Sequence, residues 1–161
     1  MLVWRICKKQ YSDSAFSGEG GLRSDGRWHY KGNRIVYTSQ SLSLATLEAW
    51  MHVGPQDQMR SYVAVPAEIP GELPIHNIHE LDLPPGWKSA RPAPRYLKDL
   101  GTLWLNLSST AVARVPAATT PGEFNYLLNP LHPDFIKIRQ LEPQPFLFDA
   151  RMWKRDQSPT R

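Results

Sequence analysis

Apolar residues alternate with polar ones over short stretches of the chain and take a helical spacing in only one long stretch. Residues 2–7 alternate weakly and are followed by two lysines, which is typical of a short opening strand. Between residues 39 and 52 apolar side chains recur at three- and four-residue steps, and Ser41 stands where a helix N-cap is expected. The pattern therefore predicts one strand and then one clear helix, which Gly54 and Pro55 end.

Short β-branched and aromatic runs between turn residues predict most of the remaining elements. One such run ends where Pro66 is expected to stop a strand, and another ends at Pro116. Residues 95–100 are expected to form at most a short helix, which Gly101 ends. We expect extended segments over residues 34–38, 60–65, 75–81, 110–115 and 125–128.

The last part of the chain has the pattern of a hairpin. Residues 135–141 and 144–150 flank Glu142-Pro143, and Phe146 and Phe148 would then share one face. Several short strands with one good helix indicate an α+β protein, and 161 residues fit one domain. We expect that domain over residues 1–150 and a polar tail over residues 151–161, whose composition is compatible with disorder.

Composition narrows the class of protein only slightly. A formal net charge of +4 comes from scattered cations, so an evenly solvated surface and a nucleic-acid footprint fit it about equally well. Cys7 is the single cysteine, which excludes an intramolecular disulfide and a cysteine-based zinc site and fits a reducing compartment. No signal-peptide pattern and no run of about 20 apolar residues is present, so we expect a cytoplasmic protein without membrane contact.

Several familiar chemistries have no motif here. The sequence contains no phosphate-binding P-loop pattern, no dinucleotide-binding Gly-x-Gly-x-x-Gly before a helix and no His-Glu-x-x-His. His76, His79 and Glu80 lie close together in sequence, but they lack a further ligand of suitable spacing. We therefore expect no metal site.

A glycine- and arginine-rich block over residues 20–30 is the most distinctive part of the sequence. Glycines allow a ligand to approach the backbone closely, and guanidinium groups can bind pyrophosphate with two hydrogen bonds. Arg23 and Arg27, four residues apart, therefore point to a ligand that bears phosphate. The alternative, that both are solvated loop cations paired with Glu19 or Asp25, is equally compatible with the residue types.

Tyr37 and Glu48 come from successive predicted elements and could meet in one cleft. Tyr37 ends a strand, and Glu48 lies on the helix that follows, between Leu47 and Ala49. Surface carboxylates rarely have such apolar neighbours. The pattern alone nevertheless favours the simpler interpretation, in which Glu48 lies on the polar face of an amphipathic helix.

Taken together, these segments resemble the RES-domain family, the toxin half of bacterial RES–Xre toxin–antitoxin pairs. The resemblance runs from about residue 2 to about residue 150, and it is specific only as an ordered set of short motifs. Its parts are Trp4-Arg5-Ile6, Gly-Gly-Leu-Arg-x-x-Gly-Arg-Trp-His over 20–29, Ile-Val-Tyr over 35–37, Ser-Leu-Ala-x-Leu-Glu over 43–48, Trp104-Leu105, Val115-Pro116 and Glu-Phe-Asn-Tyr-Leu-Leu-Asn-Pro-x-His-Pro over 123–133.

The resemblance implies a fold similar to that of the ADP-ribosyltransferase toxins, with two small, mainly antiparallel sheets around an NAD⁺ cleft and few helices. It implies an NAD⁺ glycohydrolase or phosphorylase that uses NAD⁺ as substrate and needs no other cofactor. The catalytic residues would be Arg27, Tyr37 and Glu48. The residues expected to bind the dinucleotide are Arg5, Arg23, Trp28, Ser109 and Asn125.

The chain departs from the family pattern at one position. A serine is expected after Val115-Pro116, yet Ala117 stands there. Either Ser108 or Ser109 supplies a hydroxyl nearby, or Thr119 or Thr120 does, or the activity of this member is impaired.

The resemblance also implies partners and a mechanism. An Xre-type antitoxin would silence the toxin, contact with DNA would be indirect through that antitoxin, and a homodimer is compatible with the family. Glu48 would stabilise positive charge on the ribose, Tyr37 would stack on nicotinamide, and Arg27 would hold the pyrophosphate. The alternative class is a small basic protein that binds nucleic acid or another protein through Trp28, Tyr30, Trp50 and Tyr62, without enzymatic activity.

Overall fold

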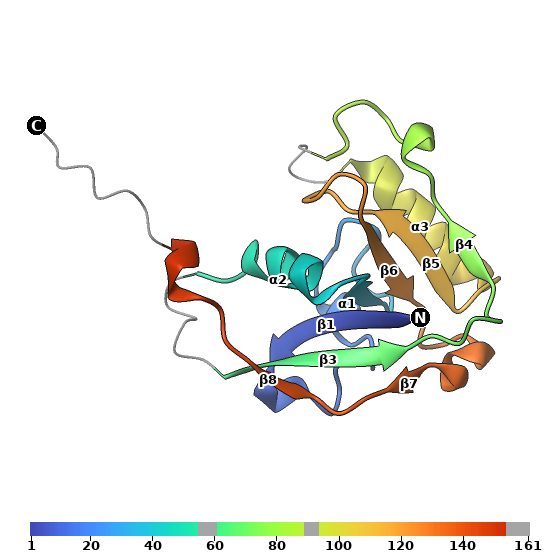
Figure 1. Cartoon of the computed structure of the whole chain (residues 1–161). Helices are drawn as coiled ribbons and strands as arrows, with labels where there is room; N and C mark the ends of the chain where they lie inside the picture. The colour runs from blue at the N-terminus through green and yellow to red at the C-terminus, as the bar shows by residue number, and fades with distance from the viewer. Residues whose placement is uncertain (55–60, 89–93, 154–161) are drawn as a thin grey trace, which may run out of the picture.

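In the computed structural model, which describes residues 1–54, 61–88 and 94–153, short helices pack against a curled sheet (Figure 1). The sheet confirms the expectation of an α+β protein with few helices. Its strands are β1 (Leu2–Lys8), β2 (Val36–Ser39), β3 (Tyr62–Glu68), β4 (Ile75–Asn77), β5 (Val112–Pro116), β6 (Phe124–Leu128), β7 (Arg139–Gln140) and β8 (Gln144–Phe146). The α-helices are α1 (Gly20–Arg23), α2 (Leu42–Trp50) and α3 (Arg95–Leu107).

Hydrogen bonds join the strands into one sheet, not the two small sheets expected from the resemblance. The strand order is β4-β5-β6-β2-β1-β3-β7, and β8 also pairs with β3. β4 runs parallel to β5, and the other pairs are antiparallel. β1 and β2 are joined only at Trp4 and Ser39, whereas β1 and β3 pair along seven residues. The sheet therefore has two well-paired halves that meet at one narrow junction.

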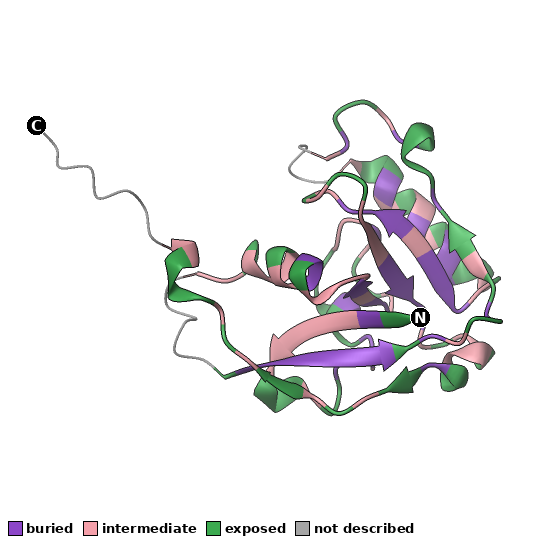
Figure 2. Cartoon of the chain, viewed as in Figure 1, coloured by how far each residue is buried: buried purple, intermediate pink, exposed green. Residues whose placement is uncertain are grey.

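Two buried clusters pack against the sheet. The first spans the β1–β2 junction, since it includes Val3 of β1, Val65 of β3 and Leu128 of β6. The second lies between α3 and the β5–β6 pair and includes Trp28, Leu97 and Trp104. Figure 2 shows buried residues along β3, β5 and β6 and exposed residues at β7 and on the outer side of α2. Burial on both sides of the β1–β2 junction fixes the two halves relative to each other.

Helix α2 begins where it was predicted, but it ends at Trp50 with Met51 as its C-cap, before Gly54, which was expected to end it. The side-chain oxygen of Ser41 accepts a hydrogen bond from the backbone N–H of Leu44, as expected of an N-cap residue. Leu44 and Ala45 are the fully buried residues of the helix, and α2 packs on β1 and β2. Pro55, which was expected to help end this helix, lies outside the described residues.

Helix α3 corrects the expectation that Gly101 ends a short helix. The helix runs for 13 residues through Gly101, and its C-cap is Ser108 in the left-handed region. A Cβ atom at position 101 would overlap the backbone carbonyl of Trp28. Gly101 therefore serves a close helix-to-loop contact and not a helix end.

Strand β3 does not stop at Pro66 as predicted, but continues to Glu68. Pro66 faces Trp4 of β1, and its carbonyl accepts the N–H of Leu141 on the opposite side of the strand. The backbone nitrogen of Pro66 faces the same edge of β3, in the gap between β8 and β7. The absence of an N–H on proline therefore removes no hydrogen bond between β3 and β1. Arg60, the predicted first residue of this strand, lies outside the described residues.

The predicted terminal hairpin is wrong. β7 and β8 each pair with β3 and not with each other, and residues Pro133–Lys137 form a 3₁₀ helix. The prediction that Phe146 and Phe148 share one face is confirmed, because their rings lie edge to face with centroids 5.0 Å apart. Trp153 packs against Phe148 in turn, so the described start of the expected tail contacts the domain.

Candidate active site

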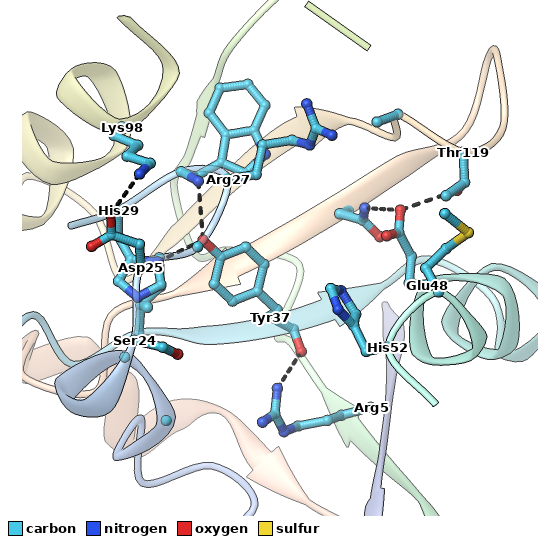
Figure 3. Close-up of a pocket in the computed structure, with 18 of the residues that line it drawn as sticks. Arg5, Ser24, Asp25, Arg27, His29, Tyr37, Glu48, His52, Lys98 and Thr119 are labelled. Atoms are coloured by element: carbon cyan, nitrogen blue, oxygen red, sulfur yellow. Dashed lines mark hydrogen bonds and ion pairs between the residues drawn. The ribbon is translucent and has the colours of Figure 1, made fainter. Parts of the chain in front are cut away.

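A cavity of about 1030 Å³ opens between α2, the β1–β2 junction and the glycine-rich segment (Figure 3). A smaller cavity of about 370 Å³ adjoins it on the side of β1 and α2. Both volumes are in the range of small-molecule sites. The residues that border both cavities are Arg5, Tyr37, Glu48, His52 and Asn125.

Glu48 stands on α2 with a half-buried side chain and a fixed carboxylate. Its Oε1 accepts hydrogen bonds from Asn125 Nδ2 at 2.8 Å and from the Thr119 hydroxyl at 3.1 Å. Asn125 is oriented in turn by the Ser39 hydroxyl, which donates to its Oδ1 at 2.7 Å. Because both bonds use one oxygen, and no donor in the described part of the chain reaches Oε2, that second oxygen can take a ligand hydroxyl.

Tyr37 on β2 lies between the glycine-rich segment and Glu48, and it is held at both ends. Its backbone carbonyl accepts a hydrogen bond from Arg5 Nη1 at 2.9 Å. Its hydroxyl accepts one from the backbone N–H of Trp28 at 3.1 Å and lies 2.8 Å from His29 Nδ1. Burial raises the pKa of the Tyr37 hydroxyl far above its usual range, so the phenol is neutral.

Two arginines border the cavity from different sides. Arg27 Nη1 donates to the carbonyl of Trp87 at 2.7 Å, which fixes the guanidinium in the wall. Burial lowers the pKa of Arg5, although a guanidinium stays charged in proteins. Arg5 Nε is buried, and among the described residues it has no hydrogen-bond partner. The cavity therefore carries fixed positive charge that can attract an anion.

The glycine-rich segment is tied to α3 by an ion pair. Lys98 Nζ lies 2.5 Å from Asp25 Oδ2, and the Lys31 N–H bonds the other carboxylate oxygen at 2.8 Å. The bond from Lys98 holds the pKa of Asp25 below its usual value. Lys98 also borders the larger cavity, so this pair closes one of its walls.

Gly26 is required where the segment meets β2. An added Cβ would lie 2.5 Å from ring atoms of His29 and 2.6 Å from the Tyr37 hydroxyl oxygen. Real Cβ contacts do not approach so closely. Gly26 therefore permits the contact between His29 and Tyr37 at the cavity wall.

Most of the residues predicted for the site come together. Trp28 borders the larger cavity, although its side chain is 2% exposed and packs against Trp87. Two predicted residues lie elsewhere: Arg23 has an exposed side chain near Glu19, and Ser109 is exposed after α3. Neither borders either cavity. The predicted residues that border the larger cavity are Arg5, Arg27, Trp28, Tyr37, Glu48 and Asn125.

Of the hydroxyls considered as replacements for the missing family serine, that of Thr119 bonds Glu48. Ala117, where the family pattern led us to expect serine, is 1% exposed and borders neither cavity. Thr119 lies two residues further on and donates directly to Glu48. Of the alternatives left open by the sequence, a threonine after β5 is therefore the one that reaches the carboxylate.

Sequence reasoning missed His29, His52 and Lys98 as residues of the site. His52 could have been found from its spacing, since the predicted helix ran to residue 52 and would have placed it one turn after Glu48, although it lies in the turn after α2. His29 stands in the motif that marked the site, but no spacing rule predicts its contact with the Tyr37 hydroxyl. Lys98 lies in a segment for which only a short helix was predicted.

Other expectations concern groups outside the cavity. In residues 1–54, 61–88 and 94–153, no three histidine, cysteine, aspartate or glutamate side chains are grouped so that they could hold a metal ion. Within the same ranges no helix is long and apolar enough to cross a membrane. Trp28 and Tyr62, two of the proposed stacking residues of the alternative class, are 2% and 7% exposed and so present little ring surface to nucleic acid.

Comparison with known proteins gives the family. The sequence matches the RES domain family over residues 2–149. It is 34% identical over 153 residues to Toxin Res of Yersinia enterocolitica, covering 94% of this chain and 99% of that protein. It is 33% identical over 163 residues to the Prs ADP-ribosylating toxin of a Sphingobium species, covering 92% of this chain and 94% of that protein. The chain therefore belongs to the RES domain family.

Within that family the full-length relatives are toxins, and the chain is a toxin of this type. Its fold is also similar to a chain in the crystal structure of the MbcT–MbcA toxin–antitoxin complex of M. tuberculosis. The TM-score is 0.71 at 14% sequence identity, with 91% of this chain and 84% of that chain covered. At that identity the likeness concerns the fold.

Proposed function

We propose that this toxin cleaves NAD⁺ at the bond between nicotinamide and ribose, with water or inorganic phosphate as the acceptor. One observation carries the proposal: the Glu48 carboxylate, fixed by Asn125 and Thr119, borders the same cavity as the Arg27 guanidinium. A negative group and a phosphate-binding cation on one cavity suit a sugar that becomes positive while its phosphates are held. The name of the Sphingobium relative, an ADP-ribosylating toxin, supports the same chemistry.

The two cavities suggest how the substrate lies. Arg27, Lys88 and Lys98 border only the larger cavity, so the pyrophosphate and the adenosine belong there. The smaller cavity is bordered by the rings of Trp4 and Tyr37 and by aliphatic groups, which suit the planar nicotinamide ring, and also by Arg5 and Lys8. Glu48 borders both cavities and therefore lies beside the bond between the two halves of the substrate.

Glu48 acts on the ribose in this mechanism. As nicotinamide leaves, positive charge grows on the ribose, and a fixed carboxylate stabilises that charge more than it stabilises the bound substrate. Oε1 is already occupied by Asn125 and Thr119, so Oε2 binds a ribose hydroxyl. Because the carboxylate is held before the substrate arrives, little reorganisation is needed during the reaction.

Tyr37 supplies a surface and not a proton. Its hydroxyl is engaged by Trp28 and His29, and its raised pKa keeps it neutral. The aromatic ring remains available to stack on nicotinamide. The hydrogen bond from Arg5 to the backbone carbonyl of Tyr37 fixes the position of β2, which carries the ring. The catalytic work therefore falls to Glu48 and to the binding energy of the phosphates.

We also propose that an Xre-type antitoxin silences the toxin by covering the mouth of the larger cavity. The fold neighbour is a toxin found in a complex with its antitoxin, which supports a protein partner of this kind. Leu47 and Met51 of α2 border the cavity with exposed side chains, so apolar contacts are available to such a partner. Contact with DNA would then be made by the antitoxin.

The proposal is tested by incubating the purified, antitoxin-free protein with NAD⁺ and following nicotinamide release. We expect wild type to release nicotinamide and Glu48→Gln to be at least about 100-fold slower, because the isosteric amide cannot stabilise the ribose cation. Glu72→Gln, at an exposed position between β3 and β4, serves as the control and should match wild type.

The other product identifies the acceptor: ADP-ribose forms if water attacks, and a phosphorylated ADP-ribose forms if phosphate attacks. Folded wild type that releases no nicotinamide would contradict the enzymatic function. Full activity of Glu48→Gln would instead contradict the role of Glu48 alone.

A further inference from the structure

We propose that His29 is a positioning residue, which holds the ring of Tyr37 in the orientation needed to stack on the nicotinamide of the substrate. The proposal rests on the proposed cleavage of NAD⁺ and extends it to a residue outside the expected arginine, tyrosine and glutamate set. His29 lies at the end of the glycine-rich segment, whereas Tyr37 lies on β2, so the contact joins the two walls of the cavity (Figure 3).

The contact is specific in its geometry. His29 is 3% exposed, and its Nδ1 lies 2.8 Å from the Tyr37 hydroxyl oxygen. The two rings are tilted at 51° with centroids 5.6 Å apart, so they meet through the hydroxyl and not by stacking. Tyr37 borders both cavities, so a ligand in either can contact it.

The direction of the hydrogen bonds follows from their chemistry. The Trp28 backbone N–H can only donate, so the Tyr37 oxygen accepts there and its own hydrogen is available to His29 Nδ1. Nδ1 accepts only in the neutral tautomer of the imidazole whose proton is on Nε2. Burial lowers the pKa of His29, which favours a neutral form. This effect outweighs the contacts with the backbone of Ser24 and Gly21 and the charge of Asp25, which raise that pKa, while the charge of Lys98 lowers it further.

The neighbouring backbone leaves the pair no room to move. A Cβ at Gly26 would collide with both His29 and the Tyr37 hydroxyl, so the segment is packed directly on the pair. At its other end Tyr37 is held by the bond from Arg5 to its carbonyl. Of these contacts, the one with His29 joins a side chain to the Tyr37 hydroxyl. A mutation of His29 can therefore remove this contact and leave the backbone contacts of Tyr37 in place.

A double-mutant cycle on nicotinamide release tests the proposal. We expect His29→Ala to lower kcat/KM about tenfold in the wild-type background, which is the scale of one lost hydrogen bond. In a Tyr37→Phe background the same change should alter kcat/KM less than about twofold, because the hydroxyl on which His29 acts is gone. His29→Asn, which retains a side-chain acceptor, should recover part of the loss. His76→Ala, an exposed histidine on β4, is the matched control and should behave as wild type.

A readout that needs no turnover keeps this proposal separate from the proposed function. In proton NMR of the free protein, we expect a slowly exchanging Tyr37 hydroxyl proton with a cross-peak to the His29 ring, lost in His29→Ala but not in His76→Ala. A loss of activity from His29→Ala that is equal in both backgrounds would overturn the proposal, because His29 would then act only on folding. Absence of the cross-peak in folded wild type would overturn it too, whether or not NAD⁺ is cleaved.

Discussion

The orientation of the Glu48 carboxylate depends on hydrogen bonds from neighbouring side chains. Two donors on one carboxylate oxygen determine which way the group faces, and both donors come from distant parts of the chain. Asn125 belongs to a paired strand and is itself held by Ser39, whereas Thr119 stands on an exposed turn. The hydroxyl of Thr119 is therefore the more easily tested of the two supports.

We predict that Thr119→Val lowers the rate of nicotinamide release about five- to tenfold, because one hydrogen bond to a charged group is lost while the side-chain volume is kept. Ala117→Ser is the comparison, since it restores the residue that the family pattern suggests. We expect it to leave the rate near that of wild type, because position 117 borders neither cavity. A large gain from Ala117→Ser would show that the missing serine limits this enzyme.

A pH dependence of stability is predicted from His29. Burial lowers the pKa of His29 in the folded protein, so the folded state binds its proton less readily than the unfolded state. Above the pKa of about 6.5 that histidine has in the unfolded state, the imidazole of His29 is neutral in both the folded and the unfolded protein. Its titration then leaves the free energy of unfolding unchanged. As the pH falls below that value, the unfolded state gains protons first and the free energy of unfolding decreases, until the folded pKa is passed.

Urea denaturation of wild type and His29→Asn between pH 8 and pH 5 measures this effect. We expect the free energy of unfolding of wild type to fall more steeply than that of the variant, since asparagine does not titrate. Parallel curves for the two proteins would mean that His29 takes up its proton as readily in the folded state as in the unfolded one.

Among the elements, α3 shows best how a glycine can be misinterpreted from sequence. Gly101 was expected to end a helix, but it lies in the middle of one because the backbone of Trp28 passes over it. A contact between residues 28 and 101 leaves no trace in local spacing. The N-cap of α2 was predictable for the opposite reason, since Ser41 and Leu44 are near neighbours in sequence.

The same helix gives a prediction for stability. Gly101→Ala should lower the free energy of unfolding by about 1–3 kcal/mol, because the strain of overpacking exceeds the gain of up to about 1 kcal/mol in helix propensity. Asn106→Ala, at an exposed position of α3, should be neutral or slightly stabilising. Urea denaturation of both variants compares them, and a stabilising Gly101→Ala would mean that the Trp28 backbone can move away.

The strands that local sequence determines were also predicted, whereas those that depend on distant contacts were not. β1, β2, β5 and β6 lie close to their predicted positions, because β-branched runs and turn residues mark them locally. β7 and β8 were assigned to each other, although both pair with β3. The pairing of these short strands is set by a partner about 70 residues away for β7 and about 80 for β8, so the sequence around them could not reveal it.

At the scale of the whole molecule, β1 and β2 join the two halves of the described sheet through the pair Trp4 and Ser39, and the cavities open beside this junction. Arg5 comes from one half and Tyr37 from the other, and a hydrogen bond links them. The resemblance to the RES family brought Arg27, Tyr37 and Glu48 to attention from sequence. It did not supply the arrangement in which His29, Thr119 and Lys98 complete the walls, because that depends on contacts between distant segments.

The hydrogen bonds to Glu48 also bear on when the site can exist during synthesis. Helix α2 leaves the ribosome long before Thr119 and Asn125, which follow Glu48 by 71 and 77 residues. Until β6 has emerged and joined β2, the carboxylate has neither of its two donors. A nascent chain therefore carries the charged residue without the organised site, and the hazard to the cell begins only when the sheet is nearly complete.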